Sequence, residues 1–167
     1  MDAALLFVRL VVGLAMAAHG AQKLFGWFGG YGLAGTGGFF EGIGFRPGRI
    51  FAFFAGLSEL GGGLLMALGL GGALGPALIV LVMLVAIFTV HISKGFFITN
   101  GGWELNASYI AAAVAVAYAG NGAFSLDRLL GFDRLASAQA ATILLIAAVV
   151  LTGLNLLMRR AVPQQTS

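Results

Sequence analysis

A few ionisable side chains stand inside otherwise apolar stretches of this chain. They are Arg9, His19 and Lys23 in the first stretch, Glu59 in the second, and His91 and Lys94 in the third. A charged group at the centre of a membrane helix costs about 2.5–3.5 kcal/mol on insertion-derived scales, so such groups pair, reach an interface or carry function. Imidazole, ammonium and carboxylate groups together can bind a polar ligand and exchange protons with it.

The spacing of these residues predicts a site near one end of a helical bundle. His19 and Lys23 are separated by one helical turn, and so are His91 and Lys94, so each pair projects from one side of its helix. The next apolar segment begins at the same membrane face. The residues that we expect to bind a ligand are His19, Lys23, His91, Lys94 and Trp103. The residues that we expect to transfer protons are Glu59 and Glu104.

Glu59 lies deeper in its segment than the other candidates, and its expected partner is Arg9, His19 or Lys23. One interpretation is a structural ion pair with Arg9 that holds the first two helices together, because buried charges are usually paired. The other interpretation is a proton-accepting carboxylate beneath a polar pocket. The sequence leaves both open.

The composition predicts an all-α integral membrane protein. Of 167 residues, 60% are hydrophobic and 9% are charged, and the mean hydropathy is +1.00. No cysteine is present, which excludes disulfides and thiolate metal ligands. The formal charge is +3, but the cations are scattered at segment ends, so we expect no nucleic-acid partner.

Five apolar runs predict a four-helix transmembrane bundle with an additional C-terminal transmembrane helix. The runs are Ala3–Phe25, Pro47–Leu70, Ala77–Lys94, Trp103–Tyr118 and Ala136–Met158. Residues 1–127 form the predicted membrane core, and residues 128–167 form a linker, the fifth helix and a short polar tail. The loop 26–46 contains either a short interfacial helix at Phe39–Ile43 or irregular structure.

The Lys and Arg count places the first loop and the C-terminus in the cytoplasm, because positive residues concentrate on the inner side of a membrane. The first run lacks a basic leader and a small-residue cleavage site, so we expect it to be retained in the membrane.

Two histidines on different helices also suit haem b, and two histidines with Glu59 or Glu104 suit a metal ion. We expect neither a haem nor a metal. Each histidine has a lysine on the same helical side, and no further motif supports haem or metal ligation.

Several segments together resemble the DoxX family of small bacterial membrane proteins. The resemblance covers about Leu5 to Asp127 and is carried by Arg9–Leu10, His19–Gly26, Glu59–Gly63, His91–Phe97, Gly101–Glu104 and Phe124–Asp127. It implies a four-helix core in the bacterial plasma membrane and an association with quinol oxidase or thiosulfate:quinone oxidoreductase subunits. The fifth helix lies beyond the usual core of the family. The sequence leaves open whether this helix forms an oligomer contact or covers the bundle.

The leading hypothesis is a redox-associated inner-membrane subunit whose pocket binds quinone or quinol and supports electron or proton transfer with redox partner proteins. The chain shows no motif for a flavin, iron–sulfur or nicotinamide group, so we expect at most a subunit of a quinone-linked oxidoreductase. Two alternatives are a carrier or channel for a small anion or weak acid, and a non-catalytic scaffold subunit. Membrane lipid and a second copy of the chain are further expected partners.

Overall fold

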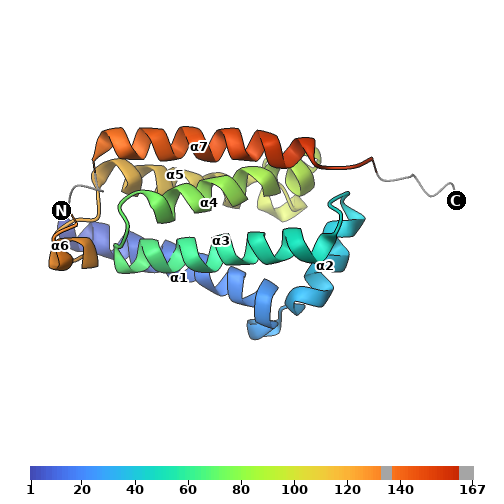
Figure 1. Cartoon of the computed structure of the whole chain (residues 1–167), viewed down its shortest axis with the longest axis horizontal. Helices are drawn as coiled ribbons and strands as arrows, with labels where there is room; N and C mark the ends of the chain where they lie inside the picture. Colours follow the sequence, from blue (N-terminus) through green and yellow to red (C-terminus); the bar gives the residue numbers. More distant parts are fainter. Residues whose placement is uncertain (133–136, 162–167) are drawn as a thin grey trace, which may run out of the picture.

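The computed structural model describes residues 1–132 and 137–161, and the long helices run side by side as a bundle (Figure 1). Two short helices, α2 and α6, lie at opposite ends of the bundle. The helix bounds are α1 Asp2–Phe25, α2 Gly32–Gly42, α3 Gly48–Leu68, α4 Leu74–Ala86, α5 Glu104–Ala119, α6 Leu126–Leu130 and α7 Ala138–Leu157. Beyond α4 the same helix continues as a π-helical turn, η2 Ile87–His91, and a 3-10 turn, η3 Ile92–Lys94.

The predicted all-α membrane bundle is confirmed. In the part of the chain that the structure describes, four helical spans are long and apolar enough to cross a membrane, namely Asp2–Phe25, Gly48–Leu68, Leu74–Lys94 and Ala138–Leu157. The shorter helix α5 packs beside α4 and runs between the same two ends. The C-terminal helix α7 packs against α4 and α5, so it covers the bundle.

Glycines bring α1 and α3 into close contact. A Cβ atom added to Gly13 would lie 2.6 Å from the carbonyl oxygen of Gly63, and one added to Gly63 would lie 2.5 Å from the backbone nitrogen of Ala17. Small residues allow membrane helices to approach in this way. The neighbouring Gly62 faces α4 in the same manner, with Leu78 Cβ at 2.9 Å from its added Cβ.

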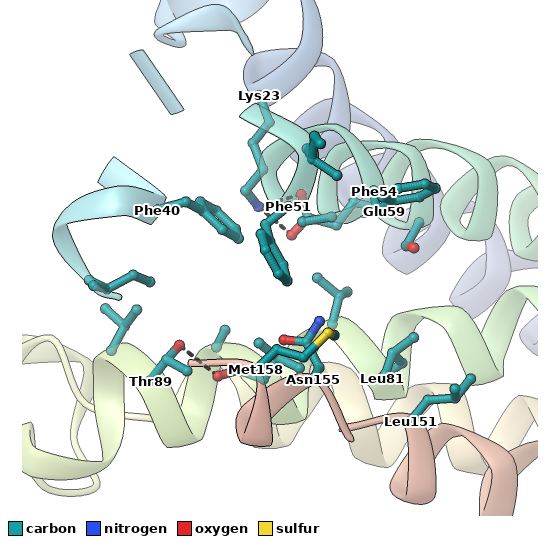
Figure 2. A pocket seen from close by; sticks show the side chains of 18 of the residues that line it. Lys23, Phe40, Phe51, Phe54, Glu59, Leu81, Thr89, Leu151, Asn155 and Met158 are labelled. Atoms are coloured by element: carbon teal, nitrogen blue, oxygen red, sulfur yellow. Dashed lines mark hydrogen bonds and ion pairs between the residues drawn. The ribbon is translucent and has the colours of Figure 1, made fainter. Parts of the chain in front are cut away.

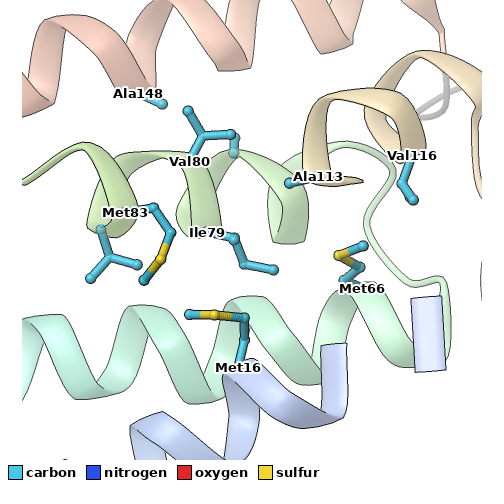
Figure 3. Packing of buried hydrophobic residues seen from close by; sticks show 10 residues of the cluster. Met16, Met66, Ile79, Val80, Met83, Ala113, Val116 and Ala148 are labelled. Carbon is cyan, nitrogen blue, oxygen red and sulfur yellow. The ribbon is translucent and has the colours of Figure 1, made fainter. Parts of the chain in front are cut away.

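The buried core lies where four helices meet α4 (Figure 3). Met16 of α1 and Met66 of α3 pack against Ile79 and Met83 of α4, and Ala148 of α7 covers the other side. These side chains are 6% exposed or less. Helix α4 thus lies at the centre of the core that it forms with α1, α3, α5 and α7.

The first loop holds a longer helix than expected. Helix α2 covers Gly32–Gly42, whereas the sequence predicted Phe39–Ile43 or no helix at all. It packs on α3 and α1, and the Thr36 hydroxyl donates to the carbonyl oxygen of Lys23 at 3.4 Å. The many glycines in α2 hide it from sequence reading, because glycine is a poor helix former in water.

Arg9 does not pair with Glu59, so the predicted structural ion pair is wrong. The Arg9 guanidinium is 1% exposed and donates to backbone carbonyls at the end of α3, Met66 and Ala67, each at 3.0 Å. Since α1 and α3 are antiparallel, Arg9 near the start of α1 is level with the end of α3. Glu59 is level with the other half of α1, near Gly20.

The same guanidinium also reaches the segment after α5, where it donates to the carbonyl oxygens of Phe124, at 3.0 Å, and Asn121. Asn121 in turn donates its side-chain amide to Asp127 at 2.7 Å, and Asp127 also accepts the backbone N–H groups of Gly71 and Gly72. Arg9 thus has a structural role through carbonyls, at the end of the bundle remote from Glu59.

Candidate functional site

A cavity of about 920 Å³ opens in the half of the bundle near α2 (Figure 2). Its walls come from α2, α3, α4 with its π-helical turn, α7 and the end of α1. Most of the lining is aliphatic or aromatic. Six polar side chains line it as well: Lys23, Ser58, Glu59, Thr89, His91 and Asn155.

One wall of the cavity carries an ion pair between α1 and α3. The Lys23 ammonium contacts both carboxylate oxygens of Glu59, and the side chains are 29% and 2% exposed. Gly56 permits this approach, because a Cβ atom at that position would lie 3.3 Å from Lys23 Cβ. Figure 2 shows the pair facing Thr89 and Asn155 across the cavity. A buried carboxylate is thus neutralised beside open space.

His91 ends the π-helical turn of Ile87–His91 and lines the same cavity. Its Nδ1 lies 2.6 Å from the carbonyl oxygen of Gly101. A carbonyl can only accept, so Nδ1 carries the proton, and Nε2 is the ring nitrogen left for another partner. Isolated π-helical turns occur frequently at functional sites.

The loop that supplies this carbonyl is tightly bonded to itself. Glu104 accepts the backbone N–H of Ile98 on Oε2 at 2.9 Å, and its own N–H donates to Phe96 at 2.9 Å. The N–H of Trp103 donates to Gly95 at 3.2 Å. The Gly101 carbonyl is therefore held in place by a network that includes Glu104.

The outer wall of the cavity consists of exposed apolar side chains on α3 and α7. Phe54 on α3 is 60% exposed, and Leu154 and Met158 at the end of α7 are 52% and 54% exposed. In a helix bundle that crosses a membrane, such side chains face hydrocarbon. This side of the cavity is therefore suited to contact with lipid.

The structure brings together only three of the predicted site residues, Lys23, Glu59 and His91. His19 is exposed on another side of α1, where its Nδ1 lies 3.2 Å from Gln22 Oε1 and its ring meets Tyr109 edge-on at 6.4 Å. Residues four apart on a helix are rotated by about 40° from each other. This rotation turns His19 toward α5 while the long Lys23 side chain reaches α3.

Lys94, Trp103 and Glu104 also lie outside the cavity lining. Lys94 is exposed beside Gly101, and Trp103 packs edge-on against Phe96 with ring centroids 4.8 Å apart. The change from α- to π- and 3-10 geometry after Ala86 alters the rotation per residue, so Lys94 does not follow His91 into the cavity.

Sequence reasoning missed Ser58, Thr89 and Asn155, as well as the aromatic wall formed by Phe39, Phe40, Phe51 and Phe54. Asn155 had a usable signal, since it is a carboxamide inside a strongly apolar segment. The others had none. Among the described residues, no three His, Asp or Glu side chains gather as they would around a metal ion.

Comparison with models of protein families matches residues 4–92 to the family described as DoxX. The matched range covers just over half of the chain and includes Lys23, Glu59 and His91. No curated protein and no solved structure matches the chain.

Proposed function

The chain belongs to the DoxX family of membrane proteins, and from this membership and the cavity we propose that it binds a quinone or quinol headgroup as the membrane subunit of a redox system. One observation carries the proposal. A single cavity has an apolar wall suited to contact with lipid, and the Lys23–Glu59 ion pair and His91 both line it. Its volume of about 920 Å³ lies in the usual range for small-molecule sites.

A quinone suits both parts of this cavity. Its ring is flat and apolar, which fits Phe40, Phe51 and Phe54, and its tail can remain in the bilayer. Its two carbonyl oxygens accept hydrogen bonds. The Lys23 ammonium and the free Nε2 of a protonated His91 are suitable donors.

Reduction of a bound quinone takes up two electrons and two protons and converts both carbonyls to hydroxyls. In our proposal the electrons come from a redox partner protein, since this chain contains no cysteine for dithiol chemistry. Lys23 and His91 lie at the cavity surface and supply or receive the protons, and Glu59 exchanges protons through Lys23.

The test is equilibrium binding of a short-tailed, water-soluble benzoquinone to the purified full chain in nanodiscs. We expect saturable binding that His91→Ala weakens about tenfold, the usual effect of one lost hydrogen bond of about 1.4 kcal/mol. His19→Ala is the matched control and keeps wild-type affinity, because His19 lies on another side of α1. Non-saturable uptake by the wild-type protein would rule the proposal out.

A carrier of a weak acid and a structural scaffold make different predictions. In proteoliposomes, saturable weak-acid flux that Glu59→Gln abolishes, without quinone binding, would favour the carrier. A scaffold would lose only thermal stability on His91→Ala. The lipid-facing wall at Phe54 and Leu154 favours a lipid-soluble ligand over a water-soluble one.

We also propose that the protein lies in a bacterial plasma membrane with its C-terminus in the cytoplasm. The ends of α1 and α7 lie at the same end of the bundle as the turn before α3. The exposed cations at this end are Arg46, Arg49, Lys94, Arg159 and Arg160. Among the described residues at the other end, Arg128 is exposed and Arg9 is buried, and Arg134 lies outside the described residues. The positive-inside rule therefore favours this orientation.

A further inference from the structure

The chain just beyond α7 is fastened to the turn between α2 and α3. Arg159 Nε donates to the carbonyl oxygen of Ile43 at 2.6 Å, and the backbone N–H of Arg160 donates to Gly44 at 2.9 Å. Gly44 has φ +98° and lies so close to the Arg160 carbonyl that a Cβ atom would collide with it. Two segments far apart in sequence are thereby joined at one membrane face.

Four arginines lie at this junction or within five residues of Gly44 in the sequence, and we call them the arginine cluster: Arg46, Arg49, Arg159 and Arg160. All four are exposed. Within residues 1–132 and 137–161, the guanidinium groups of Arg46, Arg49 and Arg160 make no hydrogen bond or ion pair.

The carboxylate nearest in sequence to the arginine cluster, Glu41, forms no ion pair with it in the described part of the chain. Glu41 Oε1 accepts the backbone N–H of Gly48 at 3.1 Å, and its side chain packs against that glycine. The Lys23 ammonium, at the same end of the bundle, is already paired with Glu59. Four arginines against the one carboxylate of Glu41 leave the junction with a net positive charge, at the depth where helices end and lipid headgroups begin.

An apolar surface adjoins the arginine cluster. Ile43 and Met158, each next to a residue of the junction, line the cavity, and Met158 is 54% exposed. A ligand that spans both surfaces must have an anionic head at the membrane surface and a hydrocarbon tail. Inorganic phosphate has the anionic group but no hydrocarbon tail, so it can occupy only the charged part of this surface.

We propose that the arginine cluster binds the phosphate of an anionic phospholipid whose acyl chains lie against the apolar ends of α3 and α7. Guanidinium groups bind phosphate oxygens through paired N–H donors, which a lysine cannot reproduce. Each cation near a membrane surface contributes about a fivefold gain in affinity for anionic lipid. The proposal does not rest on quinone binding, although Ile43 and Met158 border both the arginine cluster and the cavity.

The test uses the delipidated full chain in a neutral detergent and follows its thermal unfolding. We expect phosphatidylglycerol to raise Tm in a saturable manner, while phosphatidylcholine and inorganic phosphate at equal concentration do not. Arg46→Gln with Arg49→Gln should weaken the phosphatidylglycerol effect about twentyfold, and Arg159→Gln with Arg160→Gln provides a second test should the first variant misfold. Lys94→Gln, an exposed cation at the same face, is the matched control and should leave it unchanged.

Three results would overturn the proposal. An equal effect of phosphatidylcholine would mean that charge is not recognised. An equal effect of inorganic phosphate would mean a simple anion site without a lipid tail. A phosphatidylglycerol effect that both double variants retain would place the lipid elsewhere on the protein.

Discussion

Lys23 at the end of α1 and Glu59 in the middle of α3 form an ion pair that joins the two helices beside a cavity. The carboxylate is 2% exposed, and the ammonium is 29% exposed. Transfer of both charges from water is costly, and their attraction offsets that cost only while both partners are present. The same two side chains therefore hold α1 against α3 and supply two of the polar groups that line the cavity.

Removal of one partner should destabilise the protein more than removal of both. Lys23→Ala leaves a buried carboxylate unpaired and should cost about 3 kcal/mol, whereas Lys23→Met with Glu59→Gln should recover much of that loss. Thermal unfolding in detergent measures the difference. Lys94→Ala, at an exposed position, is the control, and equal losses for Lys23→Ala and this control would contradict the expectation.

Adjacent glycines on α3 should respond differently to the same substitution. Gly63→Ala places a methyl group against the backbone of Gly13 and Ala17, which should cost about 1–3 kcal/mol through overpacking. Gly61→Ala meets nothing within 4 Å and should be neutral or slightly stabilising. Midpoints of thermal or denaturant unfolding compare the two variants, and indistinguishable values would mean that α1 and α3 lie further apart.

Arg9→Met should prevent stable folding. The substitution removes four hydrogen bonds to backbone carbonyls, three of them buried and one, to Phe124, partly buried, and a bond to a charged group typically contributes about 1.5–3 kcal/mol. Arg9→Lys should restore little, because an ammonium cannot reproduce the planar fork of donors. The yield of detergent-soluble monodisperse protein is the measurement. Lys94→Met, at an exposed position, should give a normal yield.

Neutral His91 should carry its proton on Nδ1, because that atom faces the Gly101 carbonyl at 2.6 Å. The ¹⁵N chemical shifts of labelled protein distinguish the two tautomers directly, with His91→Ala used to assign the signals. Glu104→Gln should weaken the bond to Ile98 and broaden the His91 signals. A dominant Nε2–H tautomer in the wild type would show that the loop does not orient the ring.

Asn155→Leu should reduce quinone binding about three- to tenfold without loss of stability, because Asn155 brings a polar group from α7 into the cavity. Thr142→Val is the control on the same helix, since Thr142 bonds to Ala138 and Tyr118 outside the cavity. Equilibrium binding of the soluble benzoquinone measures both. Unchanged affinity for Asn155→Leu would remove α7 from the site.

Hydropathy alone predicted most of the helices, because a bilayer requires long apolar segments. The second expected run, Pro47–Leu70, corresponds closely to α3, Gly48–Leu68. The third run was expected from Ala77, and α4 begins at Leu74. The candidate residues Lys23, Glu59 and His91 were found for the same reason, since each is an ionisable group in an apolar run.

The sequence did not predict how each helix is rotated about its own axis relative to its neighbours. Spacing places His19 near Lys23 on one helical side but does not say which neighbouring helix each side chain meets. The π-helical turn at Ile87–His91 has no distinctive sequence signal, yet it decides that His91 faces the cavity and Lys94 does not. The antiparallel packing of α1 on α3 places Lys23 near the level of Glu59 and Arg9 near the end of α3, a relation that the sequence does not give.

Helix α5 has 16 residues, so it is about 24 Å long, whereas a typical hydrocarbon core is about 30 Å thick. Leu105 and Tyr118 near its two ends are 44% and 49% exposed, so the helix borders lipid along its length. Lipid chains beside α5 must shorten to match it, at a cost of a fraction of a kcal/mol per Å. The protein should therefore thin the bilayer on one side and partition into thinner membrane regions.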